Sequence, residues 1–174
     1  MIKGLYIGRF QPFHYGHLKA VEYCLSRVDF LIIGIGSSQF KDTVKNPFSI
    51  EERFVMVVLA LKEADVDFGR LCITAIPDSR PGEKWSEIVR SRCPSFEVVF
   101  TNDPWTRREI ADLNVKIEPI PFYRREIYEA TKIRMKILND EEWESLIPAS
   151  VVRFLNEINA VERLKAIYLP TPQT

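Results

Sequence analysis

The sequence predicts an α/β fold in which helices cover both faces of a mostly parallel, five-stranded sheet. Three observations lead to this prediction. Short apolar runs recur through the first two thirds of the chain, segments of helical periodicity lie between them, and helical patterns alone follow. Because strand and helix alternate, right-handed crossovers should join the strands into a doubly wound, Rossmann-like core with a helical C-terminal subregion.

The five predicted strands are short apolar runs, of the length expected for strands that are buried on both faces of a sheet. Gly8 ends the first run. The runs cover Ile2–Ile7, Phe30–Ile35, Leu71–Ile76, Phe96–Phe100 and Val115–Ile120.

Helical spacing of apolar residues fills the gaps between these runs. It extends over residues 18–28 and again over residues 50–61. Ser49 and Glu52 stand where a capping box would begin the second of these helices. Shorter helices are predicted over Trp85–Arg92 and Trp105–Leu113.

Beyond Pro121 the pattern is only helical. We expect helices over 131–139, 143–147, 148–158 and 161–168, with Pro148 as a first helical residue. The 174 residues are therefore predicted to form one domain. It comprises an α/β core over 1–121, a helical subregion over 122–169 and a tail over 170–174 that should fray.

Composition excludes several classes of protein. Hydrophobic residues make up 46% of the chain and charged residues 28%, as in ordinary globular proteins. Lys and Arg together number 24, as do Asp and Glu, so no net positive charge attracts nucleic acid or membrane lipid. Three scattered cysteines fit a reducing compartment better than a disulfide framework. We expect a cytoplasmic protein, without a membrane span, whose ligands are small molecules.

Ligands of open parallel sheets bind beyond the carboxyl ends of the strands. Four loops should lie there, over residues 8–17, 34–48, 77–84 and 122–131. The search for functional residues therefore begins in these loops.

The first loop holds the two histidines of the chain, His14 and His17, together with Arg9, Gly8 and Gly16. The helix that follows it offers unpaired backbone amides and partial positive charge, which suit a polyphosphate. In a purely structural interpretation, His14 is a satisfied turn residue and His17 a partial helix cap. Their spacing within one ligand loop favours the functional interpretation.

The stretch His14-Tyr15-Gly16-His17 is the H-x-G-H motif, and around it the chain resembles the archaeal type of nicotinamide-nucleotide adenylyltransferase. The resemblance extends over nearly the whole chain in the expected order. It is carried by Gly8–Phe13, Gly34–Ser38, Asn46–Phe48, Glu52–Arg53, Trp85, Thr131–Arg134, Trp143–Pro148, Val151–Val152 and Glu157–Arg163.

This resemblance implies that ATP and nicotinamide mononucleotide (NMN) react to give NAD⁺ and pyrophosphate, by direct in-line attack of the NMN phosphate on the α-phosphorus. Such a reaction needs donors for the charge that grows on phosphate oxygens, and no protein nucleophile. His14, His17 and Arg134 are the implied catalytic residues, with His17 nearest the α-phosphate, while Arg9 and Arg134 hold the β- and γ-phosphates. The residues expected at ATP are Gly8, Arg9, Phe10, His14, Gly16, His17, Thr131, Ile133 and Arg134.

Magnesium is the implied metal, bound mainly through the ATP phosphates, with no metal ligands assigned among the side chains. Trp85 matches the aromatic residue on which the family stacks the nicotinamide ring, and its polar context suits a ligand face better than a core. Packing is the alternative role for Trp85. Ser37, Ser38 and Lys45 are candidates for the NMN phosphate, or else ordinary solvated loop residues.

Two features near residue 130 affect the expected ATP contacts. Thr131 can act as an N-cap, which would place Arg134 in the first helical turn, where a cation opposes the helix dipole unless phosphate occupies the site. Glu129 stands where the family usually has serine. Its carboxylate should repel ATP unless it points away, contacts magnesium or pairs with Lys132 or Arg134.

Two alternatives remain open beside adenylyl transfer to NMN. One is a nucleotidyltransferase with another phosphate acceptor, and the other is a nucleotide-binding sensor without turnover, which Glu129 suggests. The resemblance also implies a homo-oligomer, a hexamer in archaeal relatives.

Overall fold

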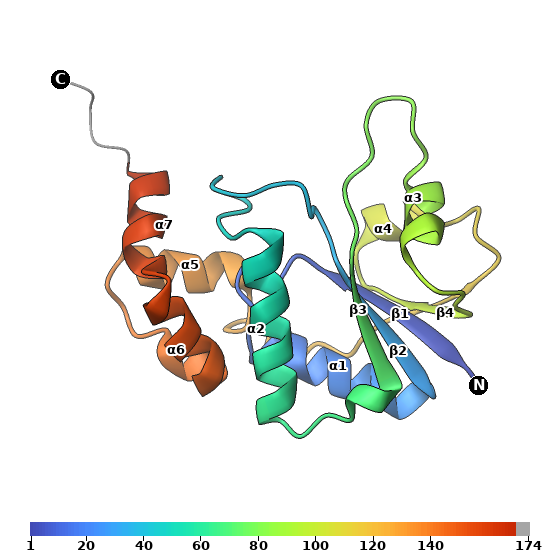
Figure 1. The fold of residues 1–174 in the computed structure, drawn as a ribbon, viewed down its shortest axis with the longest axis horizontal. Coiled ribbons are helices and arrows are strands. Elements are labelled where there is room, and N and C mark those ends of the chain that lie inside the picture. Colours follow the sequence, from blue (N-terminus) through green and yellow to red (C-terminus); the bar gives the residue numbers. More distant parts are fainter. Residues whose placement is uncertain (170–174) are drawn as a thin grey trace. The chain divides into compact units, whose positions relative to one another are not determined.

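The computed structural model describes residues 1–169, and its five strands form one sheet in the order β3-β2-β1-β4-β5 (Figure 1). Every pair of neighbouring strands is parallel, which confirms the predicted α/β class. The strands are β1 (Lys3–Gly8), β2 (Phe30–Ile35), β3 (Leu71–Ala75), β4 (Val98–Phe100) and β5 (Lys116–Glu118).

The strands β4 and β5 are shorter than predicted. The edge strands, β3 and β5, are less buried than predicted. Each of β4 and β5 has three residues. The prediction of burial on both faces is right for β2 and β4 but wrong for β3 and β5, most of whose residues are half-buried or exposed. An edge strand has only one neighbour, so less of its surface is covered.

Seven α-helices and two 3₁₀ turns complete the described part of the chain. The α-helices are α1 (Tyr15–Arg27), α2 (Ile50–Glu63), α3 (Trp85–Arg92), α4 (Pro104–Glu109), α5 (Ala130–Leu138), α6 (Ala149–Glu157) and α7 (Ala160–Tyr168). The 3₁₀ turns are η1 (Phe68–Arg70) and η2 (Glu144–Leu146). None of the helices within residues 1–169 has the length and apolar character needed to cross a lipid bilayer.

Four predicted helices differ from those observed. The first begins at Tyr15 instead of residue 18, so His17, predicted in the loop, lies in α1. The helix predicted over 143–147 is only the turn η2, and α4 ends at Glu109 rather than at Leu113. Pro148 is the N-cap of α6 and not its first helical residue. The fraying predicted for residues 170–174 lies outside the described residues.

The chain divides into two compact units that are not the two predicted parts. The first unit holds residues 1–9, 19–39 and 67–122, and the second holds 10–18, 40–66 and the chain from 123 onward. Residues 10–18 and 40–66, predicted to belong to the α/β core, pack with the C-terminal helices instead.

In the first unit, the sheet and the helix α3 enclose a hydrophobic core. Leu5, Ile32 and Val99, from three neighbouring strands, pack with Trp85 and Val89 of α3. On the other face, the ring of Tyr23 in α1 meets the ring of Phe100 edge-on at 6.3 Å. Helices therefore cover both faces of the sheet.

In the second unit, α2 packs against α6, and α7 packs against α5 and α6. The predicted capping box begins α2: Glu52 N donates to Ser49 Oγ at 3.2 Å, and Ser49 N donates to Glu52 Oε2 at 2.9 Å. Arg163 of α7 also donates to Glu52 Oε2, at 3.1 Å. The carboxylate thus caps one helix and binds another.

Candidate nucleotide site

The histidine motif forms the first turn of α1. Since α1 begins at Tyr15, His14 is in the N-cap position and His17 is the third helical residue. His14 N donates to His17 Nδ1 at 3.2 Å, and the two rings stack with centroids 3.7 Å apart. The bond repeats half of a capping box, with an imidazole in place of the usual carboxylate. The motif therefore begins the helix and also pairs two imidazoles.

Both imidazoles are neutral at ordinary pH. Burial lowers the pKa of His14, which is 4% exposed, to about 3. Burial, and then the neighbouring His14, hold the pKa of His17 well below its usual value. Because His17 Nδ1 accepts a hydrogen bond, the proton of the neutral ring is on Nε2, which is free to donate. Nδ1 of His14 is buried with no hydrogen-bond partner among the described residues.

Gly16 is needed for the position of the His14 ring. A Cβ atom built on Gly16 would lie 2.8 Å from His14 Cε1 and 2.9 Å from Cβ of Tyr128. The Tyr128 ring lies nearly parallel to that of His14, with centroids 6.4 Å apart. No side chain fits at residue 16 without moving His14 or Tyr128.

Arg134 is buried beside this turn, only 4% exposed. Its Nη1 donates to Gln11 O at 2.8 Å, its Nε to the Tyr168 hydroxyl at 3.1 Å, and its Nη2 to Thr131 Oγ1 at 3.5 Å. Three of its five N–H donors are thus directed at protein oxygens, which leaves one on each terminal nitrogen.

The start of α5 differs from the prediction. Glu129 is the N-cap, so Thr131 is the second helical residue and Arg134 lies in the second turn, not the first. The Glu129 carboxylate lies 3.3 Å from Lys132 Nζ, which is one of the arrangements expected to reduce repulsion of ATP. Both side chains are largely solvent-exposed, so this ion pair contributes little to stability.

The second unit thus brings together most of the residues expected at ATP. Phe10 and Ile133 are almost fully buried, at 1% and 0% exposed, so neither presents its side chain to a ligand in this structure. The Phe10 ring meets that of His17 edge-on at 4.9 Å and fixes its orientation. Lys45 is exposed in the loop that precedes α2.

Gly8, Arg9, Ser37 and Ser38 lie in the first unit, at the carboxyl ends of β1 and β2. Gly8 pairs with Ile35 in the sheet, and Gly36 N donates to Gly8 O at 2.9 Å. The strand ends therefore hold Arg9 and the residues that follow Gly36 close to one another.

Ser37 faces a carboxylate, which a phosphate site would not favour. Its hydroxyl lies 3.0 Å from each carboxylate oxygen of Asp78. Ser38 N donates to Ile76 O at 3.2 Å, and Asp78 N donates to the side chain of Gln39. These bonds fasten the loop after β2 to the segment after β3.

Trp85 is not in the polar surroundings that its sequence neighbours suggested. It is the first residue of α3, 3% exposed, and belongs to the hydrophobic core of the first unit. Its Nε1 donates to Pro77 O at 3.1 Å, and its ring packs against Trp105 at 4.9 Å. The expectation of a ligand face rather than a core is therefore wrong, and stacking on nicotinamide stays a prediction.

Several positioning residues were missed by the sequence reasoning. The Gln11 carboxamide is 1% exposed and bonds both backbone groups of Phe48, accepting from its N at 2.9 Å and donating to its O at 3.1 Å. Gln11 stands within the resembling stretch, which was a usable signal. Tyr128 and Tyr168 carried no such signal, because their partners are distant in sequence.

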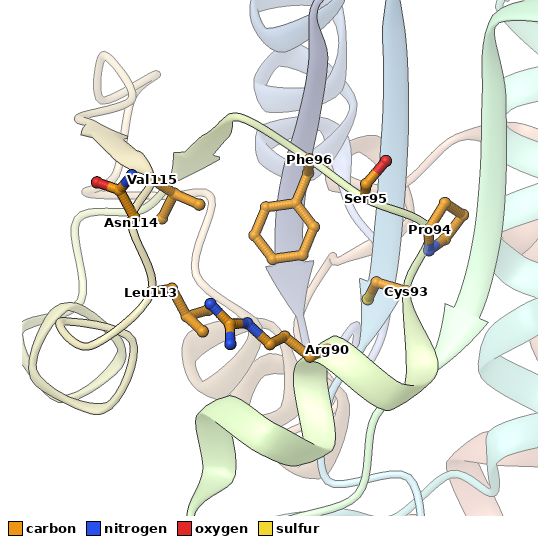
Figure 2. Close-up of a pocket in the computed structure, with 8 residues that line it drawn as sticks. All are labelled: Arg90, Cys93, Pro94, Ser95, Phe96, Leu113, Asn114 and Val115. Atoms are coloured by element: carbon orange, nitrogen blue, oxygen red, sulfur yellow. The ribbon is translucent and has the colours of Figure 1, made fainter.

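Figure 2 shows a pocket of about 400 Å³ in the first unit. Arg90 of α3 and Phe96 extend into it, and Leu113, Asn114 and Val115 form the opposite wall. It lies at the amino ends of β4 and β5, whereas the candidate loops of this unit follow the carboxyl ends of the strands. None of the residues that line the pocket is a candidate site residue.

Metal ligands do not cluster in this site. Among residues 1–169 there is no group of three or more His, Cys, Asp or Glu side chains placed to hold a metal ion. The guanidinium of Arg134 and the N–H group of His17 are hydrogen-bond donors of the kind that bind phosphate oxygens.

The chain matches the cytidylyltransferase-like family over residues 5–137. The nicotinamide-nucleotide adenylyltransferase of Pyrococcus horikoshii is 43% identical over 165 residues, which cover 95% of this chain and 88% of that protein. The enzyme of that name from Thermococcus sibiricus is 40% identical, over 95% of this chain and 89% of that protein. The one from Saccharolobus solfataricus is 41% identical, over 96% of this chain and 97% of that protein.

Solved structures share the fold. A bifunctional NMN adenylyltransferase/ADP ribose pyrophosphatase of Francisella tularensis, complexed with AMP and a manganese ion, superposes with a TM-score of 0.71 at 24% identity. The alignment covers 99% of this chain but 57% of that one, so the chain spans little more than half of the bifunctional protein. A second structure of the same protein gives a TM-score of 0.73.

The relatives match this chain along nearly its whole length, through the histidine turn of α1 and on into the C-terminal helices. The chain therefore belongs to the nicotinamide-nucleotide adenylyltransferases, within the cytidylyltransferase-like family.

Proposed function

We propose that this protein transfers the adenylyl group of ATP to the phosphate of NMN, forming NAD⁺ and pyrophosphate. The observation that carries the proposal is the pair of stacked, neutral imidazoles in the first turn of α1. One of them keeps a buried nitrogen, His14 Nδ1, without a hydrogen-bond partner among the described residues. A buried polar atom of this kind is stabilised when a ligand supplies its partner.

In this mechanism the phosphate oxygen of NMN attacks the α-phosphorus, and the bond from that phosphorus to the oxygen bridging to the β-phosphate breaks. Negative charge grows on the equatorial oxygens and on the departing pyrophosphate. His17 Nε2–H donates to an α-phosphate oxygen, and this donation needs no protonation of the ring because the neutral imidazole already carries that hydrogen. Arg134 binds the β- and γ-phosphates with its two remaining N–H groups, and Arg9 supplies a second cation.

ATP enters this reaction as its magnesium complex, so the cation arrives with the substrate. When bound, magnesium neutralises part of the polyphosphate charge. The NMN phosphate is assigned to Lys45, with weaker support for Ser37 and Ser38 because of the Asp78 carboxylate beside Ser37. Nicotinamide stacking on Trp85 would need one face of this ring, which is 3% exposed here, to become accessible.

The decisive experiment supplies the purified protein with magnesium, ATP and NMN, follows NAD⁺ with a coupled dehydrogenase, and runs nicotinic acid mononucleotide in parallel. We expect His17→Ala to lower kcat by about 100-fold or more with a smaller change in KM, because its donor acts mainly on the transition state. Glu22→Ala, an exposed position further along α1, is the matched control.

Each alternative function has its own result in this assay. ATP binding without pyrophosphate release would identify a nucleotide sensor. Pyrophosphate release with another phosphate acceptor, but not with NMN, would identify a different nucleotidyltransferase. The cytoplasmic location and the hexamer stay predictions, and gel filtration coupled to light scattering measures the latter.

A further inference from the structure

We propose that Tyr168, at the end of α7, is a positioning residue whose single hydroxyl links the ATP-binding Arg134 to the loop that carries Lys45. The inference rests on the proposed function, because it assigns these two residues to the two substrates. It goes further in making the C-terminal helix part of the substrate-binding apparatus.

The direction of the hydrogen bonds at Tyr168 is fixed by chemistry. A guanidinium can only donate, so Arg134 Nε donates to the Tyr168 hydroxyl oxygen at 3.1 Å. The single hydroxyl hydrogen is then available for Val44 O, at 2.8 Å. One side chain therefore serves the guanidinium and the backbone next to Lys45 at the same time.

The Tyr168 bond matters to Arg134 because the guanidinium is buried and held from two sides. Gln11 O accepts from a second nitrogen of the group, Nη1, at 2.8 Å. With both bonds in place, the guanidinium is held in one orientation, and so are the N–H groups left for phosphate. Without the hydroxyl, Nε–H loses its partner in a site that is 4% exposed, and the guanidinium can turn.

The loop at the other end of this link has bonds of its own. Thr43 N donates to Asn46 O at 3.2 Å, and Asn46 N donates to Thr43 Oγ1 at 3.0 Å, so residues 43–46 form a closed turn. Val44, at the tip of this turn, reaches α7 through the tyrosine hydroxyl. A shift of Arg134 toward bound phosphate is thus transmitted to the residue beside Lys45, and such coupling must act in both directions.

The position of Tyr168 argues against a role limited to folding. It is the last residue of α7, it is only half-buried, and the next residue, Leu169, is 71% exposed. The buried contacts of α7 come from Ala160 and Leu164, two turns or one turn earlier. Removing the hydroxyl alone therefore leaves the packing of the helix intact.

The test compares wild type with Tyr168→Phe, which keeps the ring and removes both bonds. We expect the dissociation constant of magnesium–ATP, measured by calorimetry without turnover, to rise by about 10-fold, as for loss of a hydrogen bond to a charged group. We also expect KM for NMN to rise by a smaller factor. The melting temperature should fall by only a few degrees, because the buried Nε–H also loses its partner in the unliganded protein. Tyr23→Phe, a tyrosine of α1 in the first unit, is the matched control and should bind ATP as wild type does.

A second background separates positioning from a general effect on the fold. The Arg134→Lys variant lacks the Nε–H group that bonds the Tyr168 hydroxyl. Adding Tyr168→Phe to this variant should therefore change its ATP affinity by less than twofold. Equal effects in both backgrounds, or wild-type affinity in Tyr168→Phe, would overturn the inference. A wild-type protein that binds ATP but forms no NAD⁺ would overturn the proposed function instead, and the ATP affinities would still decide the role of Tyr168.

Discussion

The stacked rings of His14 and His17 lie in a buried site. A proton added to either ring would place a charge where little water can solvate it. The pKa of His14 is about 3 in the folded chain, against an ordinary value near 6.5. Between these two pH values the unfolded chain binds a proton that the folded chain does not, so the free energy of unfolding falls as the pH drops.

We therefore expect stability to be fully present above pH 6.5 and to be lost progressively as the pH falls toward 3. His14→Gln should show a shallower decline, because one of the histidines that must stay neutral is gone. Urea unfolding at pH 7.5, 6 and 5 measures both slopes. Parallel slopes for the two proteins would contradict this account of His14.

Gly16 offers a second test of the same turn. Alanine favours helices over glycine, so Gly16→Ala would stabilise α1 if space were available. Because the added Cβ would lie within 3 Å of both His14 and Tyr128, we expect instead a loss of about 1–3 kcal/mol in stability. The displaced ring should also lower adenylyl transfer by about 100-fold. Thermal melting and the NAD⁺ assay check the two effects, and a stable, fully active variant would show that the turn can adapt.

The burial of Trp85 could not be predicted from the residues next to it in the sequence. The residues before it, Pro81 to Lys84, are polar and exposed, and they suggested that the ring would be so too. The side chain instead turns back to the core, where its indole N–H finds Pro77 O. Whether an aromatic ring at the start of a helix is buried depends on how that helix packs against the sheet. The neighbouring residues in the sequence carry no information about this packing.

The helix α2 illustrates how much of the fold was predictable from neighbouring residues. Its capping box was recognised from Ser49 and Glu52 because both partners lie within four positions. Ends that depend on tertiary contacts were misjudged, as at α4, which stops at Glu109, and at η2, where a full helix was predicted. In the same way, the position of both histidines at the junction of β1 and the first helix was predicted, whereas the bonds from Arg134 to Gln11 and Tyr168 were not.

The cap of α2 also gives a quantitative expectation. Ser49→Ala removes the acceptor for Glu52 N and should lower the free energy of unfolding by about 1 kcal/mol. Ser26→Ala, an exposed serine near the end of α1, is the control and should change it by less than about 0.5 kcal/mol. Chemical unfolding of both variants decides the matter, and equal losses would mean that the cap contributes nothing specific.

Chelation distinguishes a metal that arrives with ATP from one that the protein needs to fold. No group of three or more metal-ligating side chains occurs among residues 1–169, so EDTA should leave the melting temperature of the nucleotide-free protein within about 2 °C of its starting value. In the same buffer, NAD⁺ formation should stop and return with added magnesium. A large fall in melting temperature would reveal a structural ion.

The interleaving of the two units was beyond sequence reasoning, because helices were assigned to a core by their order in the chain. Residues 10–18 and 40–66 alternate along the chain with β1, β2 and β3, yet they pack with the helices that follow residue 123. Periodicity identifies a helix and its apolar face but does not identify the partner of that face.

This interleaving restricts which recombination events can leave the protein functional. No continuous stretch of coding sequence specifies either unit, so neither can be gained, lost or exchanged by recombination as an intact module. A crossover with a relative at codon 122 would join the histidine turn of one parent to the Arg134 and Tyr168 of the other. The imidazole pair, the buried arginine and the tyrosine at the end of α7 must therefore be inherited as a matched set.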